Sequence, residues 1–93
     1  MSAISGQKAI AAAGTALALG TGLVHGPLMI KALAANTSYV YVGNDGAGDV
    51  TSANGLELAA GEVIVFDHVG HQASIIVDAA VNGEGVAWLM LNV

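Results

Sequence analysis

The sequence contains no cysteine, little charge and no long apolar run, and each of these shortages removes a class of function or stabilisation. Without cysteine, the chain has neither a disulfide framework nor a thiolate metal site. Two basic residues against seven acidic ones give a net charge of −5, so neither nucleic acid nor an anionic membrane is expected as a partner. No uninterrupted run of about twenty strongly apolar residues occurs, so no membrane-spanning helix is expected.

Large side chains are also scarce, with one Trp, one Phe and two Tyr, and most of the apolar residues are alanine and valine. Residues 1–93 are expected to make a single domain near the lower size limit for one hydrophobic core. Such a core gives an isolated monomer only modest stability. Association with copies of itself or with a larger surface is therefore expected.

The N-terminal segment is apolar and superficially resembles part of a signal peptide at residues 10–19. A cleaved signal is not expected, because Lys8 alone is a poor positive region and glycines at positions 14, 20 and 22 interrupt the segment. Two roles remain open for residues 1–20: an N-terminal strand of the domain, or an arm that packs on a neighbouring subunit.

Short alternating segments between glycine-rich turns predict an all-β domain. The leucines of residues 16–19 share one face, and residues 28–34 alternate between two faces. Strands are predicted at residues 7–13, 15–19, 28–34, 39–43, 62–67, 73–78 and 86–93. The expected fold is one small β-sandwich or jelly-roll-like barrel of about six to eight short antiparallel strands.

Two features near the C-terminal end extend this prediction. Asn82-Gly83 is the strongest hairpin signal in the chain and predicts a primed turn that joins residues 73–78 to residues 86–93. The last strand is apolar on both faces. Val86, Trp88 and Met90 alternate with Ala87, Leu89 and Leu91. We expect one face of this strand to be covered by the opposite sheet and the other by a neighbour.

Two polar clusters carry metal-capable groups. His68 and His71, with His25 as a third imidazole, lack a zinc-site partner at fixed spacing, and strand positions three apart face opposite sides. Residues 44–49 resemble a calcium loop, but neither register places a glutamate at its twelfth position. No metal and no cofactor are expected, and weak ion binding at a subunit contact is the alternative for the loop.

No nucleophile-elbow sequence and no phosphate-binding glycine motif are present, so the chain is not expected to be an enzyme. The aromatic residues and the polar loop instead suggest a contact surface. Tyr39 and Tyr41 share one strand face, whereas Trp88 is either a core residue or a recognition residue. The predicted interface residues are Tyr39, Tyr41, Asn44, Asp45, Asp49, Trp88 and Leu89.

Six short motifs follow one another in a distinctive order. They are Ala-Leu-Ala-Ala-Asn-Thr at 32–37, Val-Tyr-Val-Gly at 40–43, Val-Thr-Ser-Ala-Asn-Gly at 50–55, Leu-Ala-Ala-Gly-Glu at 58–62, Ile-Val-Asp-Ala at 76–79 and Asn-Gly-Glu-Gly-Val at 82–86. With these motifs the chain resembles a group of small virion proteins of tailed bacteriophages, from residue 28 to the end. It departs from the group in an inserted tip at residues 45–49, so contacts of that loop are not carried over.

The resemblance implies a small β-sandwich protein that decorates or cements the outer surface of a bacteriophage capsid. The implied partners are the major capsid protein and copies of the chain itself, with a trimer favoured. The implied location is the virion surface after synthesis in the host cytoplasm, and the resemblance supplies no catalytic residues. Two alternatives stay open: a tail, neck or fibre-base component of the virion, and a glycan- or ion-binding β-sandwich module.

Overall fold

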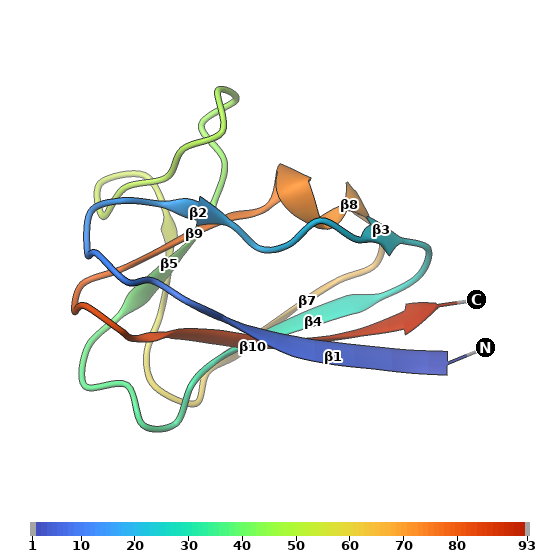
Figure 1. The fold of residues 1–93 in the computed structure, drawn as a ribbon, viewed down its shortest axis with the longest axis horizontal. Helices are drawn as coiled ribbons and strands as arrows, with labels where there is room; N and C mark the ends of the chain where they lie inside the picture. Colours follow the sequence, from blue (N-terminus) through green and yellow to red (C-terminus); the bar gives the residue numbers. More distant parts are fainter. Residues whose placement is uncertain (1, 93) are drawn as a thin grey trace.

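The computed structural model describes residues 2–92, which form ten strands and one short 3₁₀ turn, η1 (Gln72–Ser74), and so confirm the all-β prediction (Figure 1). The strands are β1 (Ser2–Ala9), β2 (Leu17–Ala18), β3 (Leu23–Val24), β4 (Leu28–Ala32), β5 (Val40–Gly43), β6 (Leu56–Leu58), β7 (Val63–Phe66), β8 (Gly70–His71), β9 (Ile76–Ala79) and β10 (Gly85–Asn92). No helix in this part of the chain is long and apolar enough to cross a membrane.

The strands pair as one long hairpin folded at its middle. β1 pairs with β10, β2 with β9, β3 with β8, β4 with β7 and β5 with β6, all antiparallel. The hairpin turns at residues 44–55, between β5 and β6. Its two arms place the chain ends side by side at one end of the molecule (Figure 1).

Two further pairings, β10 with β4 and β5 with β9, wrap this hairpin into two layers. Sheet A has the order β1-β10-β4-β7, and sheet B has the order β2-β9-β5-β6. The two-residue strands β3 and β8 form a separate small pair. Eight strands in two wrapped four-stranded antiparallel sheets are the jelly-roll arrangement.

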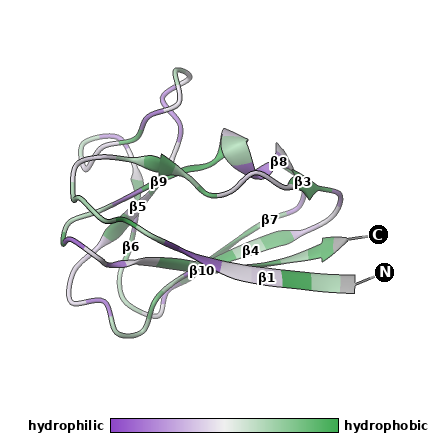
Figure 2. Cartoon of the chain, in the orientation of Figure 1, coloured by the Kyte–Doolittle hydropathy of each residue, from purple (hydrophilic) through white to green (hydrophobic). Residues whose placement is uncertain are grey.

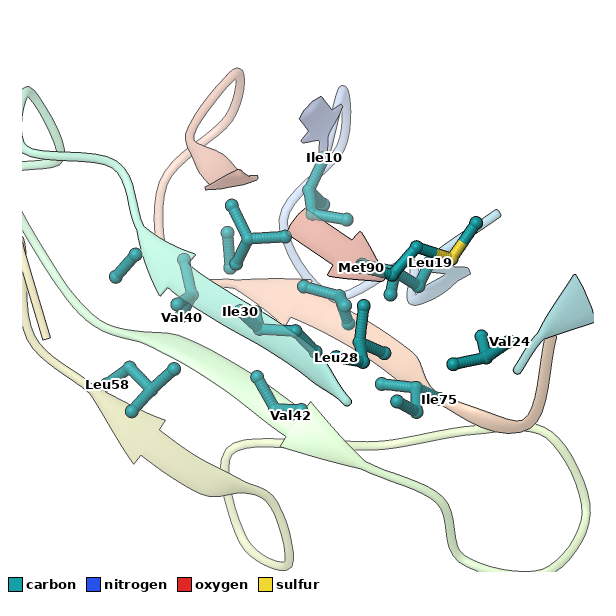
Figure 3. Packing of buried hydrophobic residues seen from close by; sticks show 14 residues of the cluster. Ile10, Leu19, Val24, Leu28, Ile30, Val40, Val42, Leu58, Ile75 and Met90 are labelled. Atoms are coloured by element: carbon teal, nitrogen blue, oxygen red, sulfur yellow. The ribbon is translucent and has the colours of Figure 1, made fainter. Parts of the chain in front are cut away.

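The inner faces of the two sheets form one apolar core (Figure 3). Leu28, Ile30 and Ala32 of β4, which alternation placed on one face, have no exposed surface. Val40 and Val42 of β5 are buried in the same cluster from the opposite sheet. Because side chains alternate along a strand, the residues between them must point away from this core.

The structure differs from the predicted strands in three places. The first strand lies at residues 2–9 instead of 7–13 and pairs with β10 of its own chain, so residues 2–9 act as a strand of their own domain. The predicted strand at residues 73–78 begins as η1 and becomes β9 only at Ile76. β3, β6 and β8 were missed because two or three residues are too few to show a period of two.

The predicted hairpin at Asn82-Gly83 is wrong. β9 belongs to sheet B and β10 to sheet A, so this turn carries the chain between the two layers. Gly83 has a positive φ of 83°, but Asn82 does not, so the primed turn is not formed. The Asn82 carboxamide oxygen instead accepts a hydrogen bond from the Ala13 N–H at 2.8 Å, which ties the turn to the segment after β1.

Candidate functional site

The outward face of sheet A is exposed and mostly apolar. We call this surface the A-face. Strand alternation and register assign to it Ala3, Ser5, Gln7, Ala9, Met29, Lys31, Val63, Val65, Ala87, Leu89 and Leu91. One row across the sheet reads Ser5, Leu89, Met29 and Val65. Val65 is 58% exposed and Leu89 is 38% exposed, and they lie in the same row on either side of Met29, so the exposed apolar residues of this face are grouped.

Lys31 is the only charged residue among these eleven positions. The seven acidic residues of the chain all lie elsewhere: Asp45, Asp49, Glu57, Glu62, Asp67, Asp78 and Glu84. Two of them, Glu62 and Asp67, flank β7 at its ends. The A-face is therefore an acid-free surface on an acidic protein.

The outward face of sheet B is covered by the chain's own loop. Tyr41 and Ile76 point outward from β5 and β9 and form a second small cluster with Val50 of the 44–55 loop. Gly55 lies so close that a Cβ placed on it would be 2.7 Å from the Cβ of Tyr41. Ala16 and Ala18 complete the cluster at the β2 edge. The part of this face that holds Tyr41 and Ile76 is thus buried within the monomer, and Glu57 on the edge strand β6 stays exposed.

The polar tip of that loop, residues 44–49, is stabilised by hydrogen bonds between its own residues. The Asn44 carboxamide oxygen accepts hydrogen bonds from the N–H groups of Gly46 and Gly48, at 2.8 and 3.2 Å. The Asp45 carboxylate accepts from Ala47 and Asp49 N–H groups at 2.8 and 3.2 Å. The tip projects from the fold as an exposed, partly hydrophilic finger (Figure 2). Its side-chain oxygens are turned toward backbone donors of the loop itself.

The structure places the four apolar residues that were predicted for an interface in different surroundings instead of on one surface. Leu89 lies at the centre of the A-face, and Tyr39 is 46% exposed just before β5. Tyr41 is only 8% exposed beneath the 44–55 loop, which corrects the expectation that both tyrosine rings are presented to a partner. The prediction paired them by strand periodicity, but Tyr39 precedes the strand and a loop covers Tyr41.

Trp88 also differs from its predicted role as an interface residue. It lies on the inward side of β10, between the buried Val86 and Met90, and packs against the core. The indole occupies space left by Gly6 of β1, where a Cβ would come within 2.6 Å of the ring atom Cζ2. Trp88 is therefore a half-buried residue of the sandwich.

Sequence reasoning missed Val63, Val65 and Met29 as contributors to the same surface as Leu89. The signal was present in the uninterrupted apolar run of β7, Val63–Phe66. A short run without polar alternation is typical of a strand whose two faces both pack against something. Ile64 and Phe66 pack on the core, so Val63 and Val65 are left on the opposite side.

Two of the motifs that carry the family resemblance meet in space. The Asn36 side chain donates to the Gly85 carbonyl at 2.9 Å and accepts from the Gly85 N–H at 3.3 Å. The Glu84 carboxylate accepts from the Thr37 N–H at 2.6 Å, from the Thr37 hydroxyl at 2.8 Å and from the Ser38 N–H at 3.2 Å. The motif residues therefore join the β4–β5 turn to the start of β10.

This contact changes the acidity of Glu84. The pKa of Glu84 lies below its ordinary value of 4.5, chiefly because the backbone N–H of Thr37 donates to the charged carboxylate. The Thr37 hydroxyl and the Ser38 N–H act in the same direction. The carboxylate is thus a structural acceptor in a turn.

The histidines do not gather into a site. His71 uses Nδ1 to accept a hydrogen bond from the Ala73 N–H at 2.9 Å and so caps η1. His25 and His68 are exposed. Among residues 2–92, no three His, Cys, Asp or Glu side chains lie close enough together to hold a metal ion.

An apolar groove with a volume of about 470 Å³ opens between β6 and β7, at the edges of the two sheets. Leu56, Ile64 and Phe66 form much of its wall, and His68 and Ser74 lie at its polar side. No hydrogen bond joins the Ser74 hydroxyl to His68 within the described chain, so the pair is not arranged as a nucleophile and its base.

No protein-family model, no curated protein and no solved structure matches the chain. Its function is therefore inferred from the geometry of its surfaces and from the motifs that its sequence carries.

Proposed function

We propose that this chain is a structural virion protein that decorates or cements the outer surface of a bacteriophage capsid. The observation that carries the proposal is the A-face, an exposed apolar sheet surface on a small acidic jelly roll. Surfaces of this kind mark sites of protein contact. The family resemblance of the motifs supplies the setting, a tailed-phage head with the major capsid protein and further copies of the chain as partners.

The mechanism is additive burial at subunit seams. Each copy contributes a modest apolar contact, and the symmetry of a shell repeats that contact many times. The 44–55 loop is a second contact element, because its self-bonded tip presents Asn44, Asp45 and Asp49 outside the compact fold. A loop that is already ordered loses less conformational entropy when it meets a partner.

The burial of other polar groups fits a purely structural role. Asp78 is 4% exposed, and its carboxylate accepts from the Gly14 N–H at 3.0 Å and the Ala79 N–H at 2.8 Å. Gln72 is buried and accepts from the Gly22 N–H at 3.1 Å. These groups, like Glu84, satisfy backbone donors of connecting segments, as buried polar groups in a stable fold must.

The test is the copy number and position of the chain on purified virions. Quantitative mass spectrometry should find many copies per particle, and cryo-microscopy should place them over the head lattice. Capsids that lack the chain should lose mechanical or thermal stability and regain it when recombinant protein is added. Absence from purified virions would contradict the proposal. A few copies on the tail axis would support the tail, neck or fibre-base alternative instead.

A further inference from the structure

The edges of the two sheets are not equally protected against pairing with another chain. The edge strands are β1 and β7 in sheet A and β2 and β6 in sheet B. β1 carries Lys8 on its inward side, β2 is only two residues long, and β6 carries Glu57 at its middle. Charges and very short strands both discourage edge pairing. β7 lacks such protection, because Val63–Phe66 contains no charged residue and no proline.

The free side of β7 presents unpaired backbone groups. The N–H of Ala32 in β4 donates to the carbonyl of Glu62 at 2.9 Å, one position before β7. Antiparallel pairs alternate between bonded and non-bonded, so the next bonded residue of β7 is Ile64. Val63 and Val65 therefore turn their N–H and C=O groups away from β4. Within residues 2–92, no turn or loop hydrogen-bonds to the backbone of these two valines.

The apolar groove of about 470 Å³ lies beside this free edge. Leu56, Ile64 and Phe66 line it from the inward sides of β6 and β7, two strands that do not pair with each other. Leu56 is 50% exposed there. A strand added to β7 would extend sheet A, and every second side chain of that strand would point over the groove. The edge and the groove thus suit one occupant, an extended backbone with apolar side chains.

The charges near the edge favour a segment of a different protein over a second copy. Glu62 precedes β7, Asp67 follows it, and both are exposed. Two β7 strands paired antiparallel would bring Glu62 of one copy close to Asp67 of the other, and like charges across a strand pair are destabilising. Pairing of β7 with β1 of a second copy would place the inward Lys8 over the apolar groove, where it has no partner.

We propose that β7 and the adjoining groove bind an extended segment of another protein by strand addition. Backbone hydrogen bonds to Val63 and Val65 hold the segment, and its alternate side chains enter the groove. The segment is apolar at those positions, uncharged in its middle and basic at its ends, opposite Glu62 and Asp67. This inference goes beyond the proposed function, because it does not depend on the assembly in which the chain works.

The first test titrates the full chain with synthetic peptides of about seven residues, close to the length of an ordinary strand. The probe has valines at alternate positions, threonines between them and a lysine at each end. One control carries N-methyl groups on the backbone nitrogens that would face β7, and another has glutamates in place of the lysines. Titration to about 1 mM peptide covers contacts smaller than a standard interface.

We expect the probe to bind at least about tenfold more tightly than the N-methylated control, because the control loses the backbone hydrogen bonds and keeps the side chains. The glutamate-ended control should bind more weakly than the probe at low salt, and this difference should shrink as salt screens the charges.

Amide hydrogen exchange, followed by NMR on the unaltered chain, locates the bound peptide. The N–H groups of Val63 and Val65 should exchange rapidly in the free chain and at least about tenfold more slowly with saturating probe. The N–H of Ile64 should be protected in both states, because it bonds to β4.

A pair of leucine variants tests the groove. Leu56→Asp should raise the Kd of the probe at least about tenfold, because the carboxylate would face apolar side chains. Leu23→Asp is the matched control and should leave Kd unchanged, since Leu23 is 60% exposed on β3 and lies outside the groove. If Leu56→Asp does not fold, Val65→Pro replaces it. Proline is tolerated where an edge N–H faces solvent, and it removes one donor to the peptide.

The inference is wrong if the probe does not bind at the highest concentration, or if it binds without slowing exchange at Val63 and Val65. Equal binding of the N-methylated control also contradicts it, because the groove then accepts apolar groups without an added strand. A chain that binds the probe but is absent from virions overturns the proposed function alone. A chain present in many copies on heads that binds no probe overturns this inference alone.

Discussion

Sheets A and B bury similar inner faces but treat their outer faces differently. Sheet B places Tyr41 and Ile76 under a loop of its own chain, and sheet A leaves Leu89, Leu91 and Val65 in solvent. The same apolar composition therefore has two consequences. On sheet B it adds to the stability of the monomer, and on sheet A it is available for association. Hydrophobicity alone does not distinguish a second core from a contact surface.

The largest expected effect comes from removing the ring beneath the loop. Tyr41→Ala should lower the free energy of unfolding by about 3 kcal/mol, because it empties a nearly buried aromatic site. Tyr39→Ala is the matched control and should cost less than about 0.5 kcal/mol, since its ring is 46% exposed. Chemical denaturation measures both. Equal costs would show that the loop does not cover sheet B in solution.

The fit of the loop on sheet B can be tested at Gly55. Gly55→Ala places a methyl group 2.7 Å from the Tyr41 Cβ and 2.9 Å from the Val50 Cγ2, so the loop must move. We expect a loss of about 1–3 kcal/mol, as for overpacked sites. Gly43→Ala is the control, because its Cβ would meet Val50 at an ordinary 3.5 Å. Thermal melts of the two variants should therefore separate clearly.

The contact of Glu84 with Thr37 predicts a dependence on pH. The pKa of Glu84 is lowered in the folded state, so its contribution is fully present above the unfolded value of about 4.5 and is lost as pH falls through the lower folded value. Glu84→Gln should lower the melting temperature at pH 7 and flatten its fall below about pH 4.5. Glu57→Gln, at an exposed carboxylate on β6, is the control. Parallel pH curves for wild type and Glu84→Gln would argue against this contact.

The smallest effect on the fold is expected on sheet A. At dilutions where the chain is monomeric, Leu89→Thr should change the free energy of unfolding by less than about 0.5 kcal/mol, because the side chain has no cover there. At high protein concentration the same change should lower the melting temperature relative to wild type, because it weakens association. A large loss at high dilution would mean that the A-face is buried within the monomer.

Much of this architecture could be predicted from local patterns. Alternation placed Leu28, Ile30 and Ala32 on one strand face, which the structure buries, and it placed Val40 and Val42 opposite Tyr41. The apolar pattern on both faces of β10 also predicted a neighbour over Leu89, and this stays a prediction, because Leu89 is exposed in the monomer. The assignments on β4 and β5 succeeded because the direction of a side chain on a strand depends on its immediate neighbours in the sequence.

Other features depended on which segments meet. Asn82-Gly83 has hairpin chemistry, but β10 pairs with β1 and β4, so the turn joins two layers instead. The difference between Tyr41 under a loop and Leu89 in solvent arises only when residues 44–55 fold over sheet B. Alternation and turn chemistry were sufficient for the fold class and for which residues share a strand face. Long-range pairing decided which outward face is left bare, because a strand's sequence does not specify what will cover it.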